Sequence, residues 1–170
     1  ALRALALLPS RDWLYCIIGE GPERAMIESL SAQLGIEKNL RLLGFVDENT
    51  KYEYLSLSDC MLVTSLHEGF GIIFMEAMHF GKPIVCTNNG GQVDFLKQKK
   101  NALLCDVGDS EGCARHLQTI MTNTKLRESL CRRNSSEVTR FFSPTIATQY
   151  MRVFEQIRRK RENDSHTDRG

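Results

Sequence analysis

The 170-residue sequence carries almost no excess charge of either sign, because its formal net charge is +1 at neutral pH. Composition therefore gives no indication of a basic surface that binds nucleic acid. No apolar run approaches the roughly 18 to 20 residues of a membrane-spanning helix. The apolar N-terminus, residues 1–8, is too short for a signal peptide. The chain begins with Ala1 rather than Met, so we expect a piece of a longer protein.

Motifs for metal binding are missing as well. The six cysteines include no Cys-x-x-Cys pair, and neither His-Glu-x-x-His nor Asp-x-Asp occurs. We therefore predict no metal ion and no other cofactor. Free cysteines in apolar, strand-like runs behave as small buried hydrophobes, and four of the six lie in such runs: Cys16, Cys60, Cys86 and Cys105. Unpaired thiols favour a reducing compartment, and we expect the cytoplasm.

What the chain does contain is an alternation of strand-like and helix-like segments. Hydrophobic residues make up 42% and charged residues 25%, as is ordinary for a globular domain. Apolar runs predict five strands, at residues 13–18, 40–43, 60–64, 83–87 and 102–105. Helical patterns occur at residues 2–8, 23–34, 49–57, 72–80, 110–121, 125–139 and 144–161. This order predicts an α/β fold with a Rossmann-like, doubly wound parallel sheet. We expect one domain over residues 1–161 and a disordered polar tail over residues 162–170.

The turn between the run at residues 60–64 and the helix at residues 72–80 is the most informative segment. Gly69 and Gly71 lie in it, and glycine lets a backbone approach a ligand closely. The N–H groups and dipole of a helix N-terminus favour an anion such as a diphosphate. Glu68 and Glu76 flank the turn, and their carboxylates can accept hydrogen bonds from sugar hydroxyls. The segment therefore predicts a site for a phosphorylated sugar.

Five motifs follow one another along the chain. They are Gly19-Glu20-Gly21-Pro22, Leu43-Gly44-Phe45-Val46, the pair Glu68 and Glu76 around Gly-Phe-Gly, Gly81-Lys82-Pro83, and Gly90-Gly91. In order and spacing, these motifs resemble the nucleotide-sugar-binding C-terminal half of retaining glycosyltransferases with the GT-B fold, the glycosyltransferase group 1 family. The resemblance runs over residues 2–158. It implies a hexosyltransferase of polysaccharide biosynthesis, whose donor is a UDP- or GDP-sugar and whose acceptor is a glycan or a lipid-linked sugar.

The resemblance also implies a role for each motif. Glu68 would be the catalytic residue that binds or orients the donor sugar, and Glu76 would bind the ribose hydroxyls. The remaining donor-binding positions would act through backbone or contact surface: Gly69, Phe70, Gly71 and Ile72 at the sugar and diphosphate, Gly19 and Gly21 on the diphosphate side, and Phe45 and Val46 near the base. No clear protein nucleophile is implied, so the protein would act by positioning the donor and stabilising the leaving diphosphate.

Two parts of the family pattern are missing from this chain. The first strand, with an Arg and a Lys in the loop after it, is absent, and so is the N-terminal acceptor-binding domain. Because that strand would lie between the strands at residues 13–18 and 60–64, we expect these two either to flank a gap or to pair directly. We also expect the chain alone to be inactive.

Several alternatives stay open at this stage. The chain could be a non-catalytic nucleotide-sugar-binding or interaction module, or belong to a different GT-B activity such as a sugar-nucleotide epimerase. Gly90 and Gly91 could simply shape a loop, and His67 could be a surface residue. The basic run at residues 158–161 suits either a solvated helix end or peripheral association with an anionic membrane face.

Overall fold

The computed structural model describes residues 1–167, with the side chains of residues 1–159. The chain divides into two units, Ala1–Ser135 and Ser136–Gly170. The first unit contains all the strands and every residue predicted to bind a ligand. It is an α/β arrangement with parallel strands, as the sequence predicts.

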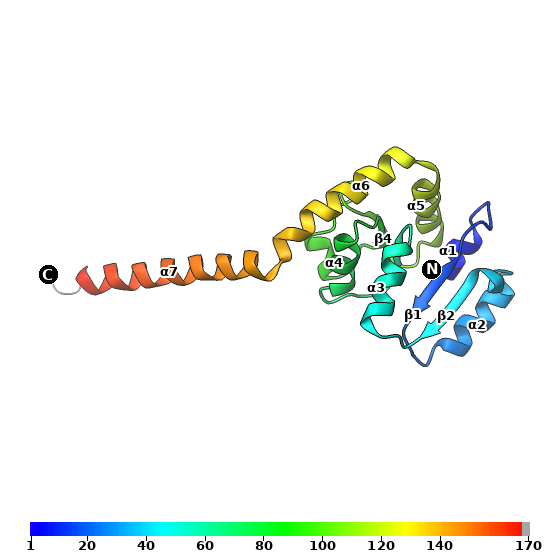
Figure 1. The fold of residues 1–170 in the computed structure, drawn as a ribbon, viewed down its shortest axis with the longest axis horizontal. Coiled ribbons are helices and arrows are strands. Elements are labelled where there is room, and N and C mark those ends of the chain that lie inside the picture. Colours follow the sequence, from blue (N-terminus) through cyan, green and yellow to red (C-terminus); the bar gives the residue numbers. More distant parts are fainter. Residues whose placement is uncertain (168–170) are drawn as a thin grey trace. The chain divides into compact units, whose positions relative to one another are not determined.

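The strands form two sheets rather than one (Figure 1). In the first sheet, β1 (Tyr15–Ile18) pairs with β2 (Leu40–Gly44). In the second, β4 (Ile84–Thr87) lies between β3 (Met61–Val63) and β5 (Leu103–Cys105). β1 and β3 are not paired with each other within the described residues, so a gap, and not direct pairing, is the outcome at the position of the absent strand.

Helices follow the strands nearly where the sequence predicts them. In the first unit these are α1 (Leu2–Ala6), α2 (Arg24–Gln33), α3 (Glu48–Leu57), α4 (Ile72–His79), α5 (Ser110–Thr122) and α6 (Thr124–Glu137), the last crossing the boundary between the units. Two short 3-10 helices, η1 (Glu37–Asn39) and η2 (Gly91–Asp94), lie in segments expected to be loops. In Figure 1, α4 and α5 lie on either side of β4.

A shared hydrophobic core holds the two sheets in one unit. Leu2 and Leu5 of α1 pack in the same cluster as Val85 of β4 and Leu103 of β5, and the half-buried Ile17 of β1 joins it. β4 is buried along its whole length because strands flank it on both sides. β1 and β3 are only half-buried, since each has an unpaired edge.

The second unit consists of η3 (Val138–Phe141) and α7 (Ser143–Thr167). The sequence predicts that this helix ends at residue 161, but it continues to Thr167. Residues 162–167 contain no Gly or Pro that would stop it. The disordered tail expected over residues 162–170 stays a prediction, and residues 168–170 lie outside the described residues. None of the helices described here has the length and apolar character needed to cross a bilayer.

Candidate functional site

The turn into α4 is shaped by Gly71. It is the N-cap residue of α4 and has a left-handed conformation, with φ of 78°. A side chain at this position would collide with the ring of Phe74 and would crowd the Cγ atom of Glu68. The N–H of Phe74 donates to the carbonyl of Gly71 at 3.0 Å, which starts the helix directly at the turn. Glycine is thus required here both for φ and for space.

A second glycine pair packs against the backbone of the same turn. The N–H of Gly91 donates to the carbonyl of Glu68 at 2.8 Å. A Cβ atom on Gly90 would collide with the backbone of Glu68, and one on Gly91 would collide with the carbonyl of Gly69. Gly90 and Gly91 therefore do more than shape their own loop, because they let it lie directly against the residues that the sequence places at the sugar.

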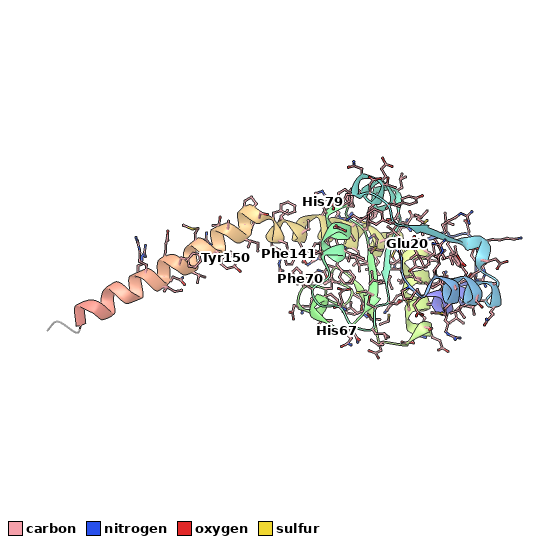
Figure 2. The ribbon with its side chains drawn as sticks, turned by 90° about the horizontal axis from the view of Figure 1, so that it is seen from below. Glu20, His67, Phe70, His79, Phe141 and Tyr150 are labelled. Atoms are coloured by element: carbon pink, nitrogen blue, oxygen red, sulfur yellow. The ribbon has the colours of Figure 1, made fainter. Side chains whose placement is uncertain are left out.

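Side chains also connect the loop that follows β4 with the turn that precedes α4. The hydroxyl of Thr87 donates to the carbonyl of Ser65 at 2.7 Å, and the amide of Asn89 donates to the carbonyl of Leu66 at 2.8 Å. The ring of Phe70 packs against Phe95, with centroids 5.5 Å apart. Figure 2 shows His67 and Phe70 on this part of the first unit. The turn is consequently held by the neighbouring loop, while a Cβ atom on Gly69 would meet no other atom within 4 Å.

The N-terminus of α4 differs from that of its neighbours in having no side-chain cap. Asp47 caps α3 by accepting from the N–H of Thr50 at 3.1 Å, and Asp109 caps α5 by accepting from that of Gly112 at 2.7 Å. At α4 the N-cap residue is a glycine, and Ile72 after it is 65% exposed. The N–H of Phe74 is bound to Gly71, so the N–H groups of Ile72 and Ile73 are the ones that an external acceptor such as an anion can meet. α2 likewise has no side-chain cap.

Gly19 and Gly44 meet at the carboxyl ends of β1 and β2. The N–H of Gly19 donates to the carbonyl of Gly44 at 2.8 Å, and φ is positive at both residues. Gly19 and Gly21 line a cavity of about 250 Å³, together with residues of β1, β2 and α2 that include Arg24 and Ile27. This cavity does not contain Glu68 or the start of α4. Figure 2 accordingly shows Glu20 away from His67 and Phe70. The glycines around Glu20 and the turn at Glu68 are therefore two separate groups of predicted site residues.

Glu76 lies on α4 and is bound by a lysine that sequence reasoning missed. Nζ of Lys51, on α3, is 2.7 Å from Oε1 of Glu76. The same ammonium is 4.0 Å from Oε1 of Glu48 and 4.7 Å from the ring centre of Tyr52. The hydrogen bond to Glu76 raises the pKa of Lys51. Nothing in local spacing points to this pair, because its members are 25 positions apart.

Phe45 and Val46 form the short connection between β2 and α3. Phe45 is 85% exposed, which is unusual for a large apolar side chain and leaves it free to contact a ligand. Asp47 then starts α3, whose Lys51 reaches Glu76. The helix α3 thus links the segment predicted to lie near the base with the carboxylate predicted to bind ribose.

No metal-binding cluster of three or more His, Cys, Asp or Glu side chains is found in the part of the chain that the structure describes. The six cysteines are free thiols. Burial raises the pKa of Cys60 and Cys86 to about 12, so both remain protonated at neutral pH. A protonated thiol is neither a good nucleophile nor a metal ligand. Cys86 is therefore a buried apolar group of the core, and Cys60 packs against the core half-buried.

Comparison with known proteins defines the class of this chain. Residues 1–136 match the family model for glycosyl transferases group 1. The chain is 34% identical over 144 residues to 2-deoxystreptamine N-acetyl-D-glucosaminyltransferase of Niallia circulans, covering 84% of this chain and 37% of that protein. It is 30% identical over 153 residues to the lipopolysaccharide core biosynthesis glycosyltransferase LpsE of Rhizobium meliloti strain 1021, covering 89% of this chain and 44% of that protein.

Solved structures agree with this assignment. The Anabaena protein Alr3699/HepE in complex with UDP-glucose has a TM-score of 0.79 at 25% identity, over 91% of this chain and 44% of that one. The C-terminal domain of the group 1 protein LpcC from Francisella tularensis has a TM-score of 0.74 at 25% identity, over 81% and 75%. The chain belongs to the glycosyl transferases group 1 family and has the fold of the C-terminal domain of GT-B enzymes. It spans less than half the length of the two relatives named above.

Proposed function

We propose that this chain is the donor-binding half of a retaining hexosyltransferase, and that its ligand is a nucleoside-diphosphate sugar. The observation that carries the proposal is the turn at Glu68, where the backbone is open at Gly69 and α4 begins without a side-chain cap. An anionic diphosphate is the ligand that such N–H groups favour. The Anabaena protein of the same fold is known in complex with UDP-glucose, which supports a UDP-sugar as the first candidate.

In this proposal each group of residues has a separate task. Backbone N–H groups of Gly69 to Ile72 hold the sugar and the diphosphate, and Glu68 orients the sugar for transfer. Gly19 and Gly21 line the diphosphate side. Glu76 binds the ribose, and the exposed Phe45 with Val46 contacts the base. Catalysis consists of positioning the donor and stabilising the charge on the leaving diphosphate.

The acceptor is a glycan or a lipid-linked sugar, which a second domain of the full-length protein would bind. Relatives named for lipopolysaccharide core biosynthesis support this class of acceptor. The reaction would take place in the cytoplasm, with peripheral association at the membrane where the acceptor is lipid-linked. A non-catalytic binding module would bind the same donor, so transfer by the full-length protein separates these two functions.

The test is calorimetric titration of the chain with UDP, UDP-glucose and GDP, on the wild type and on two variants. Glu76→Ala should weaken nucleotide binding by about 1.5 to 3 kcal/mol, the range for a hydrogen bond to a charged group. Glu53→Ala, which removes an exposed carboxylate from α3, is the matched control and should bind as the wild type does. Unchanged binding by Glu76→Ala would refute the assignment of Glu76, and absence of binding by the wild type would refute the proposal.

A further inference from the structure

The ion pair between Lys51 and Glu76 differs from the other ion pairs described for this chain. Arg24 and Glu28 pair within one helix, with side chains 46% and 56% exposed. Lys51 and Glu76 join two helices, and their side chains are only 27% and 21% exposed. Exposed pairs within a helix contribute little because water screens them. The pair between α3 and α4 is shielded better, so it restrains both side chains more strongly.

Lys51 is itself held in place by groups around its ammonium. Glu48, one turn earlier on α3, lies 4.0 Å from Nζ. The ring of Tyr52 lies below it, with 4.7 Å from Nζ to the ring centre. The Tyr52 ring in turn packs against Phe80, just after α4, at 5.7 Å between centroids. The aromatic ring and the second carboxylate restrain the position of the Lys51 ammonium. A Glu76 side chain that changed rotamer would therefore lose its hydrogen bond to Lys51.

The contact that the structure shows uses one oxygen of Glu76. Lys51 binds Oε1 at 2.7 Å. A carboxylate has about four acceptor positions on its two oxygens, so a bound Oε1 still leaves positions for two hydroxyl donors. Fixing Oε1 orients Oε2 as well, because the carboxylate is planar. The lysine can therefore orient the carboxylate for a diol without competing for it.

We propose that Lys51 is a positioning residue for the nucleoside end of the donor. It holds the Glu76 carboxylate in the orientation that accepts the two ribose hydroxyls. This inference rests on the proposed function, in which Glu76 binds ribose. Lys51 acts through Glu76 and touches no reacting atom, so it contributes to affinity and to recognition of ribose rather than to bond formation.

The experiment compares Lys51→Met, Lys51→Arg and Glu53→Gln in the 170-residue chain. The probes are UDP and 2′-deoxy-UDP, titrated by calorimetry. Lys51→Met should weaken UDP binding by about tenfold, because a charge-assisted contact that orients Glu76 is lost. Lys51→Arg keeps a cation and should restore most of that affinity. Glu53→Gln alters an exposed carboxylate of α3 that is not among the groups around the Lys51 ammonium, and it should bind as the wild type does.

Two readouts separate positioning from a general structural effect. The preference for UDP over 2′-deoxy-UDP should shrink in Lys51→Met, whereas partial unfolding would weaken both ligands equally. In a Glu76→Ala background, Lys51→Met should add no further loss, since the residue through which it acts is gone. Additive losses, or an unchanged preference for the ribose, would overturn the inference.

The outcomes also distinguish this inference from the proposed function. If Glu76→Ala weakens UDP binding and Lys51→Met does not, the proposed function stands and the role of Lys51 is refuted. If Glu76→Ala leaves UDP binding unchanged, the ribose assignment and the role of Lys51 are both refuted.

Discussion

Two glycines that touch each other across the site allow packing and ligand binding to be separated. A Cβ atom on Gly91 would overlap the carbonyl of Gly69 and would lie 3.5 Å from Cα of Phe70. A Cβ atom on Gly69 would have no other atom within 4 Å. Neither glycine has a positive φ, so alanine is permitted by the backbone conformation at both positions. The two substitutions to alanine therefore differ only in what the added methyl group meets.

Gly91→Ala should destabilise the fold, because the overlapping atoms belong to the backbone and cannot turn aside as a flexible side chain could. Forcing a methyl group into a packed region costs about 1 to 3 kcal/mol. For a chain of this size, that corresponds to about 2 to 4 °C in melting temperature for each kcal/mol. Gly69→Ala should leave the melting temperature nearly unchanged, since substitutions at open surface positions usually stay within about 0.5 kcal/mol.

At a matched temperature, ligand binding should be weakened more by Gly69→Ala than by Gly91→Ala, the reverse of their effects on stability. The methyl group of Gly69→Ala enters the space in which the donor would approach the backbone, so UDP-glucose affinity should fall at least tenfold, about 1.4 kcal/mol. The assays are thermal denaturation followed by circular dichroism, and calorimetric titration well below the melting temperature. Equal melting temperatures for the two variants would refute the packing argument. Wild-type affinity in Gly69→Ala would show that the donor does not approach this backbone.

Three further predictions concern metals, the sheet and the thiols. Binding of UDP should survive EDTA, because the proposed site holds the diphosphate with N–H groups; a strict requirement for Mg²⁺ in calorimetry would contradict this. Adding an upstream strand with a basic loop should raise UDP-glucose affinity at least tenfold, about 1.4 kcal/mol, and reduce self-association in ultracentrifugation by pairing the edges of β1 and β3. Cys86 should resist iodoacetamide at pH 8 in the native protein and react after denaturation, as measured by mass spectrometry. Because its pKa is raised from 9.0 to about 12, its contribution to stability is complete below pH 9 and should be lost as the pH rises through about 12. Alkylation of native Cys86 at pH 8, or constant stability over that range, would contradict the burial argument.

The sequence predicted the elements well because each one depends on short-range signals. The apolar run ending at Thr64 and the helix starting at Ile72 are separated by a glycine turn, and the structure places β3 and α4 on either side of it. The end of α7 was predicted less well. A polar segment without Gly or Pro carries no stop signal, so the sequence offers no residue that marks where the helix ends.

The candidate site was predicted as a set of residues but not as an arrangement. The spacing of Glu68 and Glu76 could be recognised, yet their assigned roles remain predictions. The close contact of Gly90 and Gly91 with the Glu68 turn could not be anticipated, because a glycine pair in a loop has the same appearance whether or not another backbone packs on it. Lys51 was missed for a similar reason, since its partner lies 25 positions away.

The sequence by itself determined the family, the order of strands and helices and the turns at which glycine is needed. The family follows from motifs that resemble those of its members, whereas the elements and turns follow from local conformational preference and from the alternation of apolar and polar segments. Only the tertiary structure decided that β1 and β3 remain apart in two sheets, and that Lys51 holds Glu76. Both outcomes depend on which distant surfaces meet when the core is packed. Such contacts are selected by the shape and burial of the whole unit, and no local segment encodes them.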